Sequence, residues 1–282
     1  MLHRYAATLI AALLLSACAS APTRVALEPA SKQKLNEVKV LSVLPQDEVI
    51  LRPEAYGATA ALGGGLIGAM IDSKVAEGRQ NTAQTIMAPF YGAVDDFNYR
   101  PGFQQALSTA LSTNMPVKFA KLESTSLIPL NQELSTRVAA MPNGTGMMFL
   151  RTSYTFTSDF TRLNLVTYAE IKVPGAESAV FMNTFFYQSK AHGSGGAESV
   201  KAWSDNRGMA YRAALNEATQ EITRMLALDL AASKTDPADA PKATIEKVDG
   251  PLRQPITGAV LASGPGRKIV RNIAGNMYSL PQ

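Results

Sequence analysis

The middle of the chain alternates apolar and polar side chains with the two-residue period of β-strands. The alternation runs through residues 147–157, 160–173 and 179–189, and a Pro-Gly pair marks a turn between the second and third segments. In the first segment Tyr154 falls on the apolar face and Arg151 on the polar face. Because one face of each segment is apolar, we expect a meander of three antiparallel strands with one face on a core.

A helical repeat follows the predicted meander. Apolar residues three or four positions apart run through residues 198–231 and include Trp203 and Tyr211. Such a stripe can bind a partner, but it is far more often the buried seam of a helix on a sheet, so we expect burial. The other predicted elements are strands at residues 37–44, 117–122, 257–262, 268–273 and 276–280, a long helical stretch at 81–114 with a helix start at Arg100 and Pro101, and a helix at 131–140.

Changes in composition divide the chain after this helix. A stretch rich in Pro, Asp, Ala and Lys at residues 233–250 is typical of a linker. It separates an α+β domain, residues 37–232, from a small β-hairpin unit, residues 251–282, which is too small to be stable alone and must pack on the main domain or on something else. The predicted fold class is α+β: an antiparallel sheet meander covered by helices, with a small C-terminal β-hairpin unit.

The start of the chain has the features of an export signal. An apolar run at residues 6–15 follows a short cationic start and is too short to span a bilayer. Leu15, Ser16 and Ala17 then stand directly before Cys18, which is the only cysteine of the chain. This pattern resembles a bacterial lipobox.

The lipobox resemblance implies a lipid anchor. It implies removal of a signal peptide, residues 1–17, diacylglycerol on the thiol of Cys18, and acylation of the new amino group. Residues 18–36 would then be the lipidated cysteine and a tether. Several acyl chains on one residue anchor a protein stably to a membrane. In proteobacterial lipoproteins a residue such as Ala19, in place of aspartate, implies the periplasmic face of the outer membrane.

Composition excludes several kinds of chemistry. The 282 residues carry a net charge of +4, and lysine and arginine are spread along the chain, so we expect no nucleic-acid partner. Once Cys18 is lipidated no thiol remains for a disulfide, a nucleophile or a metal. His192 is the only histidine after the predicted cleavage, and it stands in a glycine-rich stretch that predicts a solvent-exposed loop. We therefore expect no catalytic residue, no metal site and no cofactor.

A glycine-rich segment at residues 57–72 is the first candidate functional feature. Ala60, Gly64 and Gly68 recur every four residues and would give a helix a narrow packing face. The apolar part, about 14 residues, spans about 21 Å as a helix, which is less than the roughly 30 Å of a bilayer core. Three alternatives remain: a helix packed within the domain, a flexible loop, or a segment that inserts when the protein oligomerises.

The second candidate feature lies at residues 87–107, around Asp95 and Asp96. Adjacent carboxylates are compatible with a metal or an acid–base site, but no loop with the ligand spacing of Ca²⁺ or Mg²⁺ accompanies them. We expect Asp96 to cap a turn before the helix that begins near Arg100.

Two resemblances extend over larger parts of the chain. The lipobox, the glycine-rich segment and the segment at residues 87–107 together resemble a group of uncharacterised proteobacterial outer-membrane lipoproteins, as far as about Leu230. The predicted order of elements is similar to the periplasmic domains of the curli-secretion lipoprotein and of the lipoprotein activators of peptidoglycan synthases. The second is a similarity of architecture, which does not determine function.

These observations predict a non-enzymatic, lipid-anchored periplasmic protein that binds or scaffolds another envelope protein. The alternative is a self-oligomerising lipoprotein that uses residues 57–72 for subunit or membrane packing, as in a secretion or assembly complex. A third possibility, an enzyme that works with carboxylates alone, requires two carboxyl groups facing one cleft.

Overall fold

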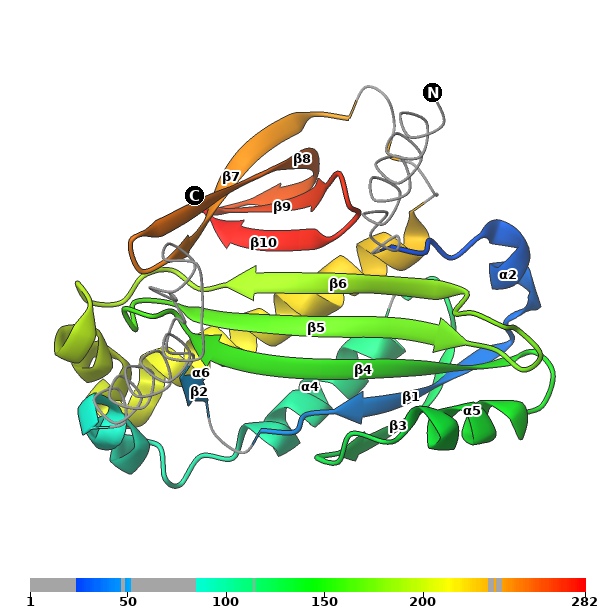
Figure 1. The fold of residues 1–282 in the computed structure, drawn as a ribbon, viewed down its shortest axis with the longest axis horizontal. Coiled ribbons are helices and arrows are strands. Elements are labelled where there is room, and N and C mark those ends of the chain that lie inside the picture. Colours follow the sequence, from blue (N-terminus) through cyan, green and yellow to red (C-terminus); the bar gives the residue numbers. More distant parts are fainter. Residues whose placement is uncertain (1–23, 47–48, 52–84, 114, 233–235, 237–239) are drawn as a thin grey trace, which may run out of the picture.

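The computed structural model describes residues 24–46, 49–51, 85–113, 115–232, 236 and 240–282. Within them, ten strands form one sheet in the order β3-β1-β4-β5-β6-β10-β9-β8-β7, and β2 pairs with β4 (Figure 1). The strands are β1 (Glu37–Val43), β2 (Ile50–Leu51), β3 (Phe119–Thr125), β4 (Thr145–Phe156), β5 (Leu163–Lys172), β6 (Phe181–Gln188), β7 (Lys242–Asp249), β8 (Leu252–Gly264), β9 (Arg267–Asn272) and β10 (Met277–Pro281). The helices are α2 (Pro29–Lys34), α4 (Tyr99–Ser112), α5 (Asn131–Ala139) and α6 (Gly196–Ala231), and residues 85–93 are also helical.

The predicted meander is confirmed, but the sheet as a whole is not antiparallel. β4, β5 and β6 pair antiparallel, whereas β1 runs parallel to both β3 and β4, and β10 runs parallel to β6. Parallel neighbours require crossover connections. Here α4 lies between β1 and β3 along the chain, and α5 lies between β3 and β4. The sheet is therefore mixed, within the α+β class that the sequence predicts.

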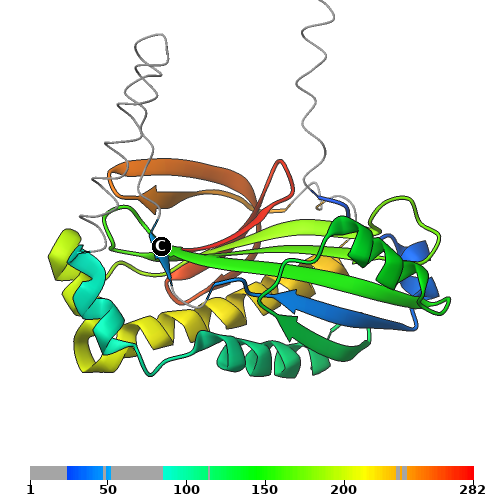
Figure 2. The same ribbon diagram turned by 60° about the horizontal axis from the view of Figure 1, so that its bottom comes forward.

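The two faces of the sheet are covered differently. Figures 1 and 2 show α4 and α6 together on one face, where they enclose the largest hydrophobic core. On the other face α5 packs against β1 and β4 through Leu134 and Val138. The same face carries the curled strands β7 and β8, and a third small cluster there joins Ile245, Ile256 and Phe186. The long β4–β6 strands thus separate a large core from two small ones.

The apolar stripe of α6 is buried as predicted, but α6 is not one continuous helix. Trp203, Tyr211 and Leu215 are almost fully buried against the sheet. Between them the backbone leaves the helix at Asp205, and the next three residues, ending with Gly208, have positive φ angles of 53°, 58° and 69°. The apolar repeat continues on both sides of this kink, and for that reason the sequence pattern does not reveal it.

The predicted helical stretch at residues 81–114 contains a break. Residues 85–93 are helical, residues 94–98 are not, and α4 then begins at Tyr99. The side chain of Asn98 accepts a hydrogen bond from the backbone N–H of Arg100, at 3.0 Å, which caps the new helix. Pro101 stands in the first turn, as predicted, where its missing N–H costs nothing.

The predicted linker at residues 233–250 is wrong for its second half. Lys242–Asp249 forms β7, Ile245 joins the small core, and the antiparallel pairing with β8 outweighs the linker-like composition. The side-chain amide of Gln188 donates to the carbonyl of Val248 and accepts from its N–H, at 2.7 and 3.0 Å, and so binds β7 to β6. The predicted C-terminal strands are confirmed as β8, β9 and β10, and β10 joins them to the main sheet by pairing with β6.

The predicted tether at residues 18–36 is wrong from Arg24 onward. Val25 pairs with Met182 at the start of β6, and α2 follows. Arg24 forms an ion pair with the buried Asp229, and a buried charge partner of this kind fixes the chain in place. The signal peptide and Cys18 lie outside the described residues. None of the helices in the described part of the chain is long and apolar enough to cross a membrane.

Candidate functional site

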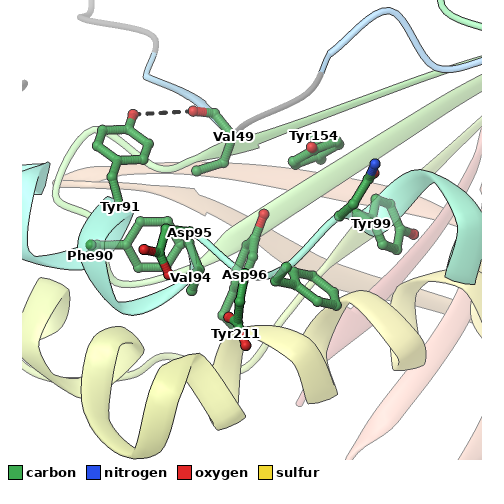
Figure 3. Close-up of a pocket in the computed structure, with 12 residues that line it drawn as sticks. Val49, Phe90, Tyr91, Val94, Asp95, Asp96, Tyr99, Tyr154 and Tyr211 are labelled. Carbon is green, nitrogen blue, oxygen red and sulfur yellow. Dashed lines mark hydrogen bonds between the residues drawn. The ribbon is translucent and has the colours of Figure 1, made fainter.

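A pocket of about 630 Å³ lies at the kinked part of α6, and the segment at residues 90–99 forms most of its wall (Figure 3). Residues from four separate parts of the chain surround it. They are Val49, Phe90, Tyr91, Gly92, Val94, Asp95, Asp96, Phe97, Asn98, Tyr99, Tyr154 and Tyr211. The second feature singled out by the sequence therefore becomes one side of a cavity, completed by β4, by α6 and by the residues after β1.

Aromatic rings make up the walls of the pocket. Phe90 contacts Tyr211 edge to face with 4.9 Å between ring centroids, and it contacts Phe156 in the same way at 5.4 Å. Tyr99 and Tyr154 form a third edge-to-face pair at 5.3 Å. Aromatic pairs in this geometry contribute about 0.5–1.5 kcal/mol beyond the area that they bury, so these pairs stabilise the walls of the pocket.

The phenol hydroxyls of the pocket are held by the protein. The hydroxyl of Tyr99 lies 2.7 Å from Oγ1 of Thr219, and that of Tyr91 donates to the carbonyl of Val49 at 3.3 Å. Burial raises the pKa of Tyr99 and that of Tyr211 far above the usual value of a phenol. These hydroxyls stay protonated at neutral pH, so they can exchange hydrogen bonds but cannot act as bases.

At the rim of the pocket one of the two carboxylates is paired. Nη2 of Arg212 lies 2.6 Å from Oδ1 of Asp96. The guanidinium of Arg212 also lies over the ring of Phe97, with Cζ 4.4 Å from the ring centroid. The hydrogen bond from Arg212 lowers the pKa of Asp96, which favours the charged carboxylate. Asp95 is exposed, and the described part of the chain offers it no ion pair.

Two contacts fix the walls of the pocket to one another. Gln46 follows β1 along the chain. Its side-chain amide donates to the carbonyl of Tyr154 and accepts from the N–H of Tyr154, each at 2.9 Å. Gly208, at the kink of α6, lies so close to Val94 that a Cβ atom would stand 2.5 Å from Cγ1 of Val94. The kink of α6 therefore makes room for the segment at residues 90–99.

His192 is not the solvent-exposed loop residue that the sequence predicts. Its ring is half-buried against Trp203, with 4.1 Å between the ring centroids. The indole N–H of Trp203 donates to the carbonyl of Phe160 at 2.7 Å, which fixes the ring that His192 contacts. Burial lowers the pKa of His192, and the nearby charge of Glu217 partly opposes this. The histidine has a packing role.

The remaining candidate residues are not brought to this pocket by any described contact. Cys18, Ala60, Gly64 and Gly68 lie outside the described residues. Along the chain the segment at residues 52–84, which holds the glycine-rich repeat, begins shortly after Val49 and ends shortly before Phe90. In the described parts of the chain no three His, Cys, Asp or Glu side chains come together to hold a metal ion.

Sequence reasoning finds only part of the pocket. Asp95, Asp96 and their aromatic neighbours stand out because they are consecutive. Tyr154 lies in a predicted strand and Tyr211 in the apolar stripe of a predicted helix. No local pattern indicates that both line one pocket. Comparison with known proteins adds no assignment, because no protein-family model matches this chain and no curated protein is similar to it.

Proposed function

We propose that the protein is a non-enzymatic, lipid-anchored binding or scaffold component of the bacterial outer membrane, and that the aromatic pocket docks a partner protein of the envelope. The lipobox at Cys18 supports the anchor and the location. The observation that carries the binding function is the pocket itself, an aromatic hollow with an exposed carboxylate, Asp95, at its rim.

The chemistry of the pocket indicates the kind of group that it accepts. Its volume of about 630 Å³ falls within the roughly 300–1,000 Å³ usual for binding pockets. Protein interfaces concentrate their binding energy in aromatic or aliphatic side chains that fill pockets of this kind. Phe90 and Tyr99 are almost fully buried, so we expect the partner to place such a side chain at the mouth of the pocket, beside the half-buried Tyr91 and Phe97. A lysine or arginine nearby would face Asp95.

Photo-crosslinking in intact cells tests this function. Phe97 is replaced by the photoreactive benzoylphenylalanine, which keeps an aromatic side chain in the pocket wall. In a control protein the same replacement is made at Leu127, an exposed residue after β3 that does not line this pocket. We expect a crosslink from position 97 to a distinct envelope protein, and a several-fold weaker product when Asp95→Lys is added. The absence of any product at position 97, or an equal yield of the same product at position 127, would contradict the proposal.

The alternative function is self-assembly through residues 57–72. It is favoured by the position of this segment along the chain, since both of its ends stand next to pocket residues, Val49 and Phe90. A crosslink from position 97 to a second copy of the chain would support it. Gly64→Leu should then abolish the oligomer and leave the monomer folded, because leucine blocks close approach of a second backbone.

A further inference from the structure

A buried cluster of charges fixes the point where the chain enters the fold. Asp229, on the last turn of α6, is fully buried, and its carboxylate lies 2.9 Å from Arg24 and 2.8 Å from Arg271. Asn183 of β6 donates to the same carboxylate at 2.6 Å. Arg271 also forms an ion pair with Asp236. Arg24 is thus bound to α6, and the shared carboxylate of Asp229 connects it to β6 and β9.

The turn between β9 and β10 lies directly beside this entry point. Gly275 closes the turn, and a Cβ atom added to it would stand 2.4 Å from Cβ of Arg24. Its N–H donates to the carbonyl of Asn272 at 2.9 Å, which leaves Ile273 and Ala274 as the two central residues of the turn. The turn therefore lies directly beside the side chain of Arg24.

Ile273 is an unusual residue for that position. Central turn positions favour Gly, Pro, Asn, Asp and Ser, and β-branched apolar side chains are disfavoured there. Nevertheless Ile273 is fully exposed, at 103% of its reference area, and is the most exposed large apolar side chain of the described residues. The side chain of Ile273 buries no apolar surface when the chain folds, so that surface is available to a partner.

The length of chain before Arg24 points to the partner. Only residues 19–23 separate Cys18 from Arg24, and six Cα-to-Cα steps span at most about 20 Å when fully extended. An anchor at Cys18 therefore holds Arg24, and the turn beside it, close to the lipid headgroups. A β-branched apolar side chain at such a position gains by entering the acyl boundary of the bilayer.

We propose that Ile273 inserts into the membrane beside the lipid anchor and so orients the domain on the bilayer. This inference rests on the proposed lipidation of Cys18. It places the turn between β9 and β10 at the membrane. The exposed apolar loop that contains Leu127 and Leu130 follows β3, the strand furthest from β9 in the strand order, and it serves as the matched control.

Site-specific fluorescence on the lipidated full-length protein tests the contact. Ile273→Cys and, separately, Leu127→Cys each introduce the single free thiol, since the thiol of Cys18 carries the lipid. Each protein is labelled with the environment-sensitive nitrobenzoxadiazole dye and reconstituted into vesicles of phosphatidylethanolamine and phosphatidylglycerol. We expect a blue-shifted emission at position 273 that is quenched at least two-fold by spin-labelled acyl chains, and no change at position 127.

Two results would overturn the inference, and they can be told apart. Mass spectrometry that shows the lipid on Cys18, together with unshifted and unquenched emission at position 273, would overturn the membrane contact alone. A mass without lipid would overturn both the anchor and the contact. Thermal melts equal to those of the unsubstituted protein establish that both variants are folded, as expected for two exposed positions.

Discussion

Charged side chains have different surroundings in two regions of this molecule, around Asp229 and around Asp95. Around Asp229, buried charges are matched by charges and amides, so that the N-terminal segment, the end of α6 and the C-terminal strands are held together. Around Asp95, aromatic rings pack edge to face and surround a pocket of about 630 Å³ with a carboxylate at its exposed rim. In the first region the described charges pair with one another, whereas the second region surrounds a pocket.

The difference teaches where to look for function in this chain. Removing one partner of a buried ion pair is strongly destabilising, because it leaves the other charge buried without compensation. The pocket has buried aromatic walls, but Asp95 and part of Phe97 remain exposed at its mouth, where a partner could cover them. The Asp229 cluster therefore holds the fold together, and the aromatic pocket is the region for which we propose binding.

The largest predicted effect removes the central charge of the buried cluster. Asp229→Ala leaves Arg24 and Arg271 buried without their common counter-charge, and a loss of about 3–5 kcal/mol in the free energy of unfolding is expected. Denaturation by urea measures it. The control Glu246→Ala removes a carboxylate from the exposed pair with Arg253 and should cost less than about 1 kcal/mol. Equal losses in the two variants would mean that the cluster does not hold the fold together.

The second effect concerns the kink that opens the pocket. Gly208→Ala places a Cβ atom 2.5 Å from Cγ1 of Val94, at a positive φ angle of 69°, and should lower the free energy of unfolding by about 1–3 kcal/mol. Adding Val94→Ala should restore part of this loss, because it removes the clashing atom.

Another glycine gives the matched control for the kink. Gly102 stands in α4 with nothing within 4 Å of an added Cβ atom. Gly102→Ala should therefore raise the free energy of unfolding, by about 0.5–1 kcal/mol, because alanine favours a helix. If Gly208→Ala were also stabilising, close packing of the kink against Val94 would be refuted.

A third effect tests the hydroxyls of the pocket. Tyr99→Phe removes a buried hydrogen bond to Thr219 and should cost about 1 kcal/mol, since Thr219 keeps its bond to the carbonyl of Leu215. Tyr168→Phe removes a half-buried bond to Glu170 on the other face of the sheet and should cost less. Chemical denaturation of both variants checks the order, and the reverse order would be inconsistent with a tightly held pocket.

The smallest effect is a pH dependence. Burial lowers the pKa of His192 in the folded state, so the unfolded chain takes up its proton first as the pH falls. The stability contributed by neutral His192 is therefore present above the pKa of an unfolded histidine, about 6.5, and is lost as the pH falls below it. His192→Gln should reduce the difference between the melting temperatures at pH 7.5 and pH 5.5. An unchanged difference would show that the ring titrates as freely as in the unfolded chain.

The fold was predictable where one short period governs burial. β4, β5 and β6 alternate because one face packs on α4 and α6, and this is visible residue by residue. The parallel pairing of β1 and of β10 was not predictable, because it depends on crossovers between distant segments. The sequence pattern does not reveal the kink of α6, because the kink depends on a close contact with Val94 that leaves no periodic signal. It does not reveal β7 either, because the composition of β7 is that of a linker and its pairing with β8 and Gln188 is tertiary.

The candidate site was predictable only on its consecutive side. Residues 87–107 stand out by composition, but the structural role of Asp96 depends on Arg212, more than a hundred residues away. The same holds for Arg24, whose partner Asp229 belongs to the end of α6. Short sequence patterns report local geometry, and both of these pairs are products of the tertiary fold.

The most direct test of the account is the intact mass of the protein extracted from the membranes of the bacterial cells that express it. The account predicts a chain that begins at Cys18 and carries diacylglycerol on its thiol and an acyl group on its amino group, and it predicts loss of this mass and of membrane association in Cys18→Ser. A chain that keeps residues 1–17, or one that is cleaved there but carries no lipid, would contradict it.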